Sequence, residues 1–468
     1  MRKSGADHSP CRRRRSIPSR QKFLLDPLSS VPARPSLGRN LAVLAGGEVM
    51  ARVLTFVSFV HVARALEPAT FGLVEVTLAT VMFLTIAAEH GVAELGAREV
   101  ARGAVGIEAL ARRIVSGQLF AAAGLYAVLA TAVLVLPLDA TLRRLLLGYG
   151  LSVLGLPFLL AWVFQGRNQM ARVAVLQVLR AAIFTAAVLL AVHAPVHVLR
   201  LPLVEVGAVA VTAAASVWWL RRSGEHVRVG LHAALDAQTF RDSLPIGGSK
   251  LLWACRMYLP IIILASCVGS AEVGRFGAAH RILLVGQTVL GVYFTAVFPT
   301  ISRLAYDSID DLARFLQGSL RLALWPAVAL ALTVTWGAPM LLQVLFGSQY
   351  IRGEATGTLA VLIWIVPILA WRRHGRSALI ALDRQREELW CSLGGMALLV
   401  GLAVVLSYAY GMLGAAWAMV VSEFVATLLT WGRLRRRIPS LRWLHELWGL
   451  PPLAMLTGRG DPYARGVR

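Results

Sequence analysis

Charged residues are scarce in this sequence. They make up 15% of its 468 residues, whereas soluble domains ordinarily carry roughly 25%. Hydrophobic residues make up 57%, so much of the protein surface must face something other than water. Cysteine is also rare, and the four cysteines show neither CxxC spacing nor a neighbouring histidine cluster. We therefore expect neither a disulfide framework nor a zinc site.

Motifs of soluble catalytic sites are missing as well. The sequence contains no GxxxxGK(S/T), no GxGxxG after a strand, no GxSxG and no HExxH. His193 and His197 have the spacing of helical metal ligands, but Pro195 lies between them and places them in a loop. We predict that the protein is not an enzyme and that it has no cofactor and no metal site.

Long apolar runs dominate the rest of the chain. A helix needs about 20 mainly apolar residues to cross the hydrocarbon core of a bilayer, and twelve segments meet this requirement. The runs are continuous and do not alternate with polar residues, which is typical of membrane helices. Transmembrane helices are predicted near 41–62, 70–91, 113–138, 145–164, 172–193, 199–220, 245–268, 275–299, 319–345, 355–371, 387–409 and 411–432.

Basic residues outnumber acidic ones by 47 to 25, and their distribution predicts a topology. Placing the N-terminus inside puts 37 of the 47 on the inner side, six on the outer side and four within helices. Because inner loops of membrane proteins carry the excess of basic residues, both termini are predicted to be cytoplasmic. Basic residues between apolar runs favour anionic membrane lipids as partners, and no nucleic acid is expected.

The predicted fold class is therefore an all-α integral membrane protein of about 12 transmembrane helices in two six-helix lobes. The longest inner connection is polar and is interpreted as the linker between the lobes. Trp443 and Trp448 suggest a short helix in the membrane interface. The predicted parts are a disordered basic cytoplasmic tail at 1–39, an N-terminal six-helix lobe at 40–221, a cytoplasmic linker at 222–240, a C-terminal six-helix lobe at 241–433 and a cytoplasmic tail with an interfacial helix at 434–468.

Short motifs recur in the two predicted lobes. Gly46-Gly47 opens the first helix and Gly247-Gly248 the seventh, while Phe71-Gly72 opens the second and Phe276-Gly277 the eighth. An offset of six helices is an even number, so both lobes keep the same orientation in the membrane. This pattern predicts a parallel repeat about an axis normal to the membrane, as some transporters have.

Charges inside the predicted spans are the candidate functional residues. An Arg at a helix centre costs roughly 2.5–3.5 kcal/mol on insertion scales, so such residues should face the protein interior or a wet cavity. We hypothesise a central cationic cavity that binds an anionic group, since basic side chains complement phosphate. Structural pairing and snorkelling are the alternative. The candidate substrate-binding residues are Arg52, Arg256, Lys250, Arg180 and Arg281.

Two carboxylates within spans are candidates for ion coupling. Glu48 lies four residues before Arg52, so the two can also pair on one helix face. Glu423 lies within the last predicted helix. A basic group at Arg372–Arg376 follows the tenth helix. It is interpreted either as the inner mouth of the cavity or as ordinary anchoring to the inner leaflet.

Several stretches resemble a known family. Residues 46–102, GGEVMARVLTFVSFVHVARALEPATFGLVEVTLATVMFLTIAAEHGVAELGAREVAR, resemble the N-terminus of Wzx-like polysaccharide flippases. These belong to the multidrug/oligosaccharidyl-lipid/polysaccharide exporter superfamily. Further similar stretches are VGSAEVGRFGAAHRI, LFGSQY, ALDRQ and YGMLGAAWAMVVSE. The likeness covers about 40–435.

The resemblance implies a transporter that moves an oligosaccharide on a polyprenyl diphosphate across the bacterial cytoplasmic membrane. It implies alternating access of two lobes and polysaccharide-assembly membrane proteins as partners. Any energy source is expected to be an ion gradient, because the sequence shows no nucleotide-binding motif. A drug or cation exporter of the same superfamily is one alternative, and it should have an acidic or aromatic cavity. A membrane-embedded glycosyltransferase or polymerase is another, and it should have a large outer loop with catalytic carboxylates. A scaffold protein is the third.

Overall fold

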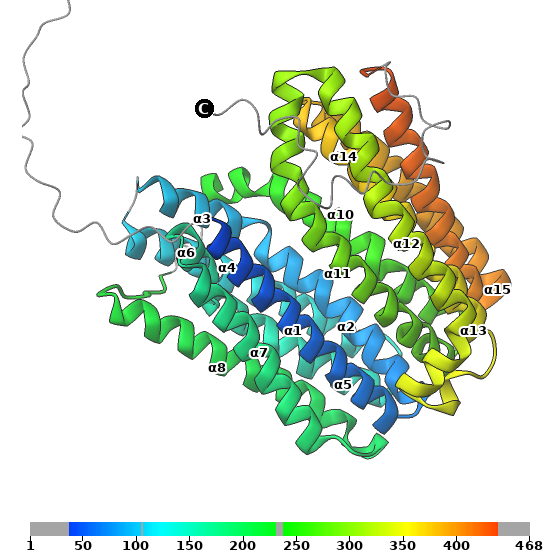
Figure 1. Ribbon diagram of the computed structural model, residues 1–468. Helices are drawn as coiled ribbons and strands as arrows, with labels where there is room; N and C mark the ends of the chain where they lie inside the picture. Colours follow the sequence, from blue (N-terminus) through cyan, green and yellow to red (C-terminus); the bar gives the residue numbers. More distant parts are fainter. Residues whose placement is uncertain (1–36, 104–105, 231–236, 439–468) are drawn as a thin grey trace, which may run out of the picture.

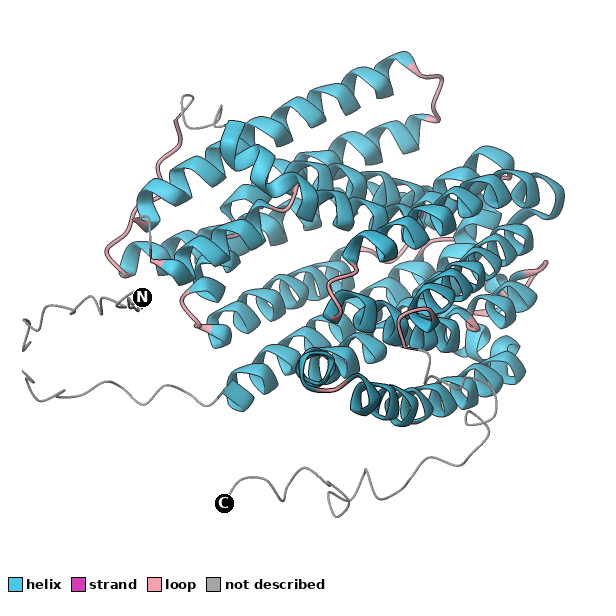
Figure 2. Cartoon of the chain, turned by 90° about the horizontal axis from the view of Figure 1, so that it is seen from above, coloured by secondary structure: helices cyan, strands magenta, loops and turns pink. Residues whose placement is uncertain are grey.

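A computed structural model describes residues 37–103, 106–230 and 237–438, and helix is the only regular structure in these ranges (Figures 1 and 2). Most of the predicted basic tail, part of the predicted linker and the predicted interfacial helix lie outside the described residues. The remainder divides into two helical bundles joined by the predicted linker region.

The first lobe contains six crossings and one short additional helix. Its fourth crossing is composite, because a 3-10 segment with Pro157 interrupts it. The elements are α1 (Leu37–Ala65), α2 (Pro68–Glu89), α3 (Val92–Arg102), α4 (Ile107–Val135), α5 (Ala140–Leu151), η1 (Ser152–Phe158), α6 (Ala161–Gly166), α7 (Met170–Ala191), η2 (Pro195–Leu199) and α8 (Arg200–Arg222). The short α3 has no counterpart in the prediction.

The second lobe repeats this plan. Its fourth crossing is also broken, between Leu362 and Ile365. The elements are α10 (Ala237–Cys267), α11 (Ser270–Asp307), α12 (Ile309–Phe346), η3 (Ser348–Tyr350), α13 (Ala355–Leu362), α14 (Ile365–Ala381) and α15 (Gln385–Arg435).

The number of crossings follows from a break within α15. The described residues contain eleven helical segments long and apolar enough to span a membrane, and the last has 51 residues. Non-helical backbone at Tyr410 and Gly411, with φ of +53° at the glycine, divides this segment into two arms. Glycine tolerates that φ without steric strain. The two arms correspond to the predicted helices 387–409 and 411–432, which confirms about 12 crossings.

Helix ends are placed by local sequence. Pro68 occupies the first turn of α2, where a missing N–H is harmless. The Asp139 carboxylate caps α5 by accepting from the backbone N–H of Thr141 at 2.8 Å. The positions at which helices begin also show the parallel repeat. Helix α2 begins at Pro68 and α11 at Ser270, which are 202 residues apart (270 − 68).

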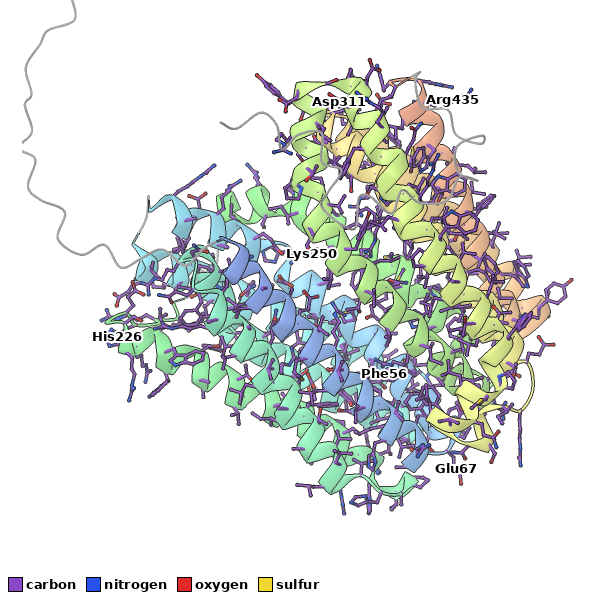
Figure 3. The ribbon with its side chains drawn as sticks, in the orientation of Figure 1. Phe56, Glu67, His226, Lys250, Asp311 and Arg435 are labelled. Atoms are coloured by element: carbon purple, nitrogen blue, oxygen red, sulfur yellow. The ribbon has the colours of Figure 1, made fainter. Side chains whose placement is uncertain are left out.

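The two lobes form a V (Figure 1). We call the end of the bundle at which α1 begins the basic face, and the other end, with the turn between α1 and α2, the opposite face. Figure 3 places Glu67 near the vertex, at the opposite face, and His226 and Asp311 at the far ends of the two lobes. The lobes therefore converge at the opposite face and diverge toward the basic face.

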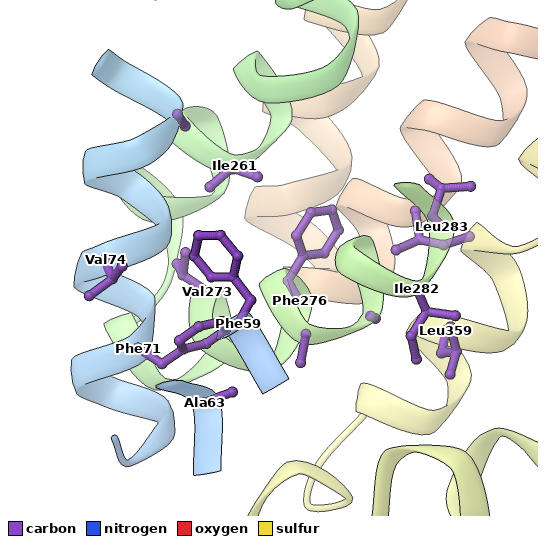
Figure 4. Packing of buried hydrophobic residues seen from close by; sticks show 14 of the residues in the cluster. Phe59, Ala63, Phe71, Val74, Ile261, Val273, Phe276, Ile282, Leu283 and Leu359 are labelled. Atoms are coloured by element: carbon purple, nitrogen blue, oxygen red, sulfur yellow. The ribbon is translucent and has the colours of Figure 1, made fainter. Parts of the chain in front are cut away.

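The core at the vertex is shared by both lobes. Phe59 of α1 and Phe71 of α2 gather with Val273 and Phe276 of α11 (Figure 4), and all four are buried. Tyr350 adds a T-shaped contact to Phe71 at a centroid distance of 6.1 Å. Burial of aromatic rings from both lobes joins them at this end.

Candidate functional site

A close crossing of α2 and α11 seals the opposite face. A Cβ placed on Gly72 would lie 1.9 Å from the Ser270 carbonyl oxygen, and one on Gly274 would lie 1.9 Å from the Pro68 carbonyl oxygen. The two helices are thus in backbone contact, which only glycine permits. The contact is reciprocal, because both glycines touch the first turn of the other helix.

Hydrogen bonds from the second lobe to the end of α1 strengthen this seal. The Tyr350 hydroxyl donates to the carbonyl oxygens of Ala63 at 2.8 Å and Leu66 at 3.3 Å. In the other direction, Arg64 Nε donates to the Leu345 carbonyl oxygen at 2.8 Å. These acceptors lie at or just beyond helix C-termini, where carbonyls lack helical partners.

The facing surfaces of the lobes become exposed toward the basic face. On α1, Phe59 is 6% exposed, whereas the Arg52 side chain is 57% exposed and that of Glu48 is 45% exposed. All three share one face of the helix at 3.6 residues per turn. On α11, Val285 and Val289 continue the face that meets α2, and they are 44% and 66% exposed. We call the region between these surfaces the interlobe cleft.

The lobes stay joined on their other side through α10. Lys250 Nζ lies 2.6 Å from both Glu89 Oε1 and Glu94 Oε1 of the first lobe. A Cβ placed on Gly247 would lie 2.5 Å from the His90 carbonyl oxygen, so the backbones touch here as well. Contacts along α2 and α10 thus link the lobes at both ends, and the cleft opens between α1 and α11.

At mid-depth, Arg281 of α11 spans the lobe boundary. Its guanidinium lies 2.9 Å from Glu75 Oε1 of α2 and its Cζ lies 3.5 Å from the ring centroid of Phe59. The Glu75 side chain is 3% exposed. An ion pair and a cation–π contact therefore close the cleft at this depth.

Among the residues that the structure describes, Arg52 forms an ion pair only with Glu48 of its own helix. Its Nη2 lies 3.0 Å from Glu48 Oε1, as the i, i+4 spacing predicted. Both side chains are about half exposed, and exposed pairs of this kind stabilise by about 0–1 kcal/mol. A ligand with stronger acceptors can displace Glu48 at little energetic cost.

The structure does not bring the five candidate cations into one cluster. Arg52, Lys250 and Arg281 lie along the lobe boundary. Arg180 lies within the first lobe, 25 residues before its partner Glu205. Arg256 is 8% exposed inside the second lobe. The predicted single cavity lined by Arg52 and Arg256 together therefore needs correction, since the interior of the second lobe separates Arg256 from the cleft.

Glu423 also differs from the expectation. It is 4% exposed and contacts Arg256 and Arg372, so it neutralises buried guanidinium groups. Glu48 keeps the exposure that an ion-coupling carboxylate needs.

Sequence reasoning missed several residues of the boundary. Glu75 lies within a predicted span. The insertion-cost argument that selected Arg281 as a candidate therefore applies equally to Glu75, which is the ion-pair partner of Arg281. Glu89 and Glu94 flank the end of α2 and resemble ordinary inner-loop residues. Tyr350 belongs to the LFGSQY stretch, but nothing in its local sequence indicates a contact with α1.

This architecture is that of a multi-pass membrane transporter built from two six-helix lobes. The family model described as "Polysaccharide biosynthesis protein" matches residues 37–305, more than half of the chain. The chain therefore belongs to this family, and the resemblance to Wzx-like flippases is confirmed. No curated protein matches the chain.

Solved transporters share the fold. A multidrug resistance MATE family transporter of the MOP superfamily in an inward-facing conformation matches with a TM-score of 0.68 at 16% identity, over 84% of this chain and 96% of that one. An outward-facing structure of such a transporter matches with a TM-score of 0.57 at 15% identity, over 87% and 97%. A MOP superfamily transporter from Pyrococcus furiosus, described as having a binding pocket of reverse polarity, matches with 0.58 at 16% identity, over 88% and 98%.

Proposed function

We propose that the protein is a flippase that moves an oligosaccharide linked to a polyprenyl diphosphate across the bacterial cytoplasmic membrane. The observation that carries the proposal is the exposed Arg52 on the cleft-facing surface of α1, in a family named for polysaccharide biosynthesis. The basic face is the cytoplasmic side in this proposal, because basic residues concentrate there. Anionic lipids and polysaccharide-assembly membrane proteins are the proposed partners.

Alternating access accounts for the asymmetry between the two faces. The lobes touch at the opposite face through Gly72 and Gly274 and diverge at the basic face. The higher TM-score to the inward-facing transporter is consistent with an inward-open state. In the outward-open state, the contacts of Tyr350 and Arg64 with the facing lobe must break. Rocking of one lobe against the other would expose the same site to each side in turn.

Arg52 is the best candidate to hold the diphosphate. Its guanidinium offers a planar fork of N–H donors that matches phosphate oxygens. Lys250 has two carboxylates at 2.6 Å, and Arg281 is held by the buried Glu75. In the described part of the chain, the charge of Arg52 is balanced only by the exposed Glu48, so Arg52 is the most available of these cations for a ligand. The opening between α1 and α11 would let the lipid tail remain in the bilayer.

Glu48 is the proposed coupling carboxylate. A diphosphate that pairs with Arg52 releases Glu48, which could then bind a proton or a metal cation from the gradient. The buried pairing of Glu423 with Arg256 and Arg372 supports a structural role for that residue instead.

Substitution of Arg52 tests the proposal. Loss of a bidentate hydrogen bond to a charged group costs about 1.5–3 kcal/mol, which corresponds to roughly a 10- to 150-fold loss of transport. Export of a lipid-linked oligosaccharide should fall by this factor in Arg52→Gln and vanish in Arg52→Glu, with partial retention in Arg52→Lys. The assay is surface glycan on intact cells that otherwise lack a flippase, with membrane insertion checked by immunoblot.

Arg314→Gln is the matched control, because it removes the same charge at a side chain that is 76% exposed on α12. It should export at the wild-type rate. Wild-type export by inserted Arg52→Glu protein would refute the assignment of Arg52. Uptake of organic cations by vesicles, with no glycan export, would favour the drug exporter.

A further inference from the structure

A second group of charges lies inside the second lobe, away from the interlobe cleft. Arg256 comes from the middle of α10, and three further arginines come from α14. Arg372, Arg373 and Arg376 occupy a sector of about 100° on that helix at 3.6 residues per turn. Two carboxylates, Glu388 and Glu423, face them from the two arms of α15. We call these six residues the arginine cluster.

Both carboxylates contact guanidinium groups of the cluster. Glu423 uses one oxygen for Arg256 and the other for Arg372 Nη1 at 2.7 Å. Glu388 Oε1 accepts from the Ser392 hydroxyl at 2.8 Å and lies 3.7 Å from Arg372 and 3.6 Å from Arg376. The pairs form a ladder from the middle of the lobe, where Arg256 and Glu423 lie, to its basic face, where Arg376 is 50% exposed.

Across the part of the chain that the structure covers, the arginines of the cluster, in contrast, have N–H groups without acceptors and a charge without a carboxylate partner. Arg256 Nη1 and Arg372 Nε are buried and have no hydrogen-bond partner among the described residues, and these two arginines are only 8% and 6% exposed. Within the described ranges, no carboxylate lies within ion-pair distance of Arg373. Its guanidinium lies 6.0 Å from the ring centroid of Phe294, and its Nη1 is 3.8 Å from the position of a Cβ on Gly291.

Charge balance therefore calls for an anion. Four guanidinium groups face two carboxylates, so the cluster carries two more positive charges than negative ones, and Arg373 is the arginine without an ion-pair partner in the described ranges. Buried charges are tolerated when they are paired, and buried N–H donors normally have an acceptor. An anion beside Arg373 would supply the missing counter-charge. Arg376 connects the cluster to the basic face and marks the route of entry.

We propose that the arginine cluster is a binding site for a phosphate-type oxyanion. Arginine forks match the tetrahedral oxygens of phosphate better than they match a spherical halide. The ligand is either free phosphate from the cytoplasm or the phosphate head of a lipid. The site is separate from Arg52, so it does not rest on the proposed transport function. A bound oxyanion would tie α10 to α14 and stiffen the second lobe.

The test is ligand-dependent thermal stability of the purified full-length protein in detergent. Inorganic phosphate should raise the Tm of the wild-type protein more than sodium chloride does at the same ionic strength. Arg373→Gln removes a side chain with no ion-pair partner and should fold normally, but its apparent affinity for phosphate should fall at least tenfold. Arg386→Gln is the control, because this exposed arginine lies at the same end of the lobe. It should respond like the wild-type protein.

Two further measurements complete the test. One distinguishes a lipid head from free phosphate as the ligand, and the other distinguishes this proposal from the proposed transport function. In Arg52→Gln protein, which lacks the proposed transport site, a response to farnesyl diphosphate at concentrations where inorganic phosphate has no effect would identify a lipid head as the ligand; equal responses would identify the free ion. Both support an oxyanion site. Arg52→Gln should keep the phosphate response even if it loses transport. Equal stabilisation by chloride and phosphate, or an unchanged response in Arg373→Gln, would overturn the proposal.

Discussion

Replacing Gly72 by alanine perturbs the point at which the lobes are in closest contact. The new Cβ would lie 1.9 Å from the Ser270 carbonyl oxygen, whereas carbon and oxygen in contact are roughly 3.3 Å apart. Helices α2 and α11 must therefore separate by about 1.4 Å or carry the overlap as strain. Overpacking of this size costs about 1–3 kcal/mol.

In the proposed alternating-access cycle, this overpacking energy destabilises only the conformation in which the opposite face is closed. The clash exists where the opposite face is closed and disappears where α2 and α11 have moved apart. The equilibrium between the two states should therefore shift toward opening at the opposite face by about 5- to 150-fold, since 1.4 kcal/mol is a factor of ten. The overall fold should survive, because each helix keeps its contacts within its own lobe.

Cysteine labelling at Ala63 measures the shift. Ala63 is fully buried at the end of α1, beneath Tyr350. In a chain whose four native cysteines are replaced by serine, a polar maleimide should modify Ala63→Cys slowly. Adding Gly72→Ala should raise the labelling rate by about the factor above. Gly124→Ala is the matched control, because no atom lies within 4 Å of a Cβ at that helical glycine. Equal labelling rates with and without the Gly72→Ala substitution, in folded protein, would refute the idea that this crossing closes the opposite face.

Two further substitutions test neighbouring contacts. Tyr350→Phe removes the hydroxyl that donates to Ala63, so it should weaken the same seal by about 1 kcal/mol and raise labelling about fivefold; unchanged labelling would show that the hydrogen bonds do not hold the seal. Arg281→Gln leaves the buried Glu75 carboxylate unpaired, and the thermal unfolding of the purified protein should show a loss of about 3–5 kcal/mol. The double substitution Arg281→Gln with Glu75→Gln should recover most of that loss, and a double variant less stable than Arg281→Gln would contradict the pairing.

The sequence was sufficient for the crossings because bilayer thickness sets a minimum apolar length. All twelve predicted segments correspond to helices or helix pairs, with ends that differ by several residues. The short α3 (Val92–Arg102) was missed because it alternates apolar with charged residues and is too short to span. The predicted boundary between 387–409 and 411–432 coincides with the break at Tyr410 and Gly411, where the glycine adopts a positive φ that the sequence alone did not indicate.

The candidate site was predictable only where partners are close in sequence. Arg52 and Glu48 lie one helical turn apart, so their pairing follows from helix geometry alone. Arg281 and Glu75 are 206 residues apart, and their contact depends on how the two lobes dock. Arg256 shows the same limit, because insertion cost indicates that an arginine must be enclosed but not whether a cleft or a lobe interior encloses it.

The reciprocal crossing of α2 and α11 places the same steric requirement on the two halves of the chain. Gly72 rests on the first turn of α11 and Gly274 on the first turn of α2, so a side chain gained by either half would displace both. Elsewhere the two lobes differ: one joins Ser58 to Thr185 by a neutral hydroxyl pair, while the other carries the arginine cluster. At this crossing, a larger side chain on either helix would clash with the backbone of the other.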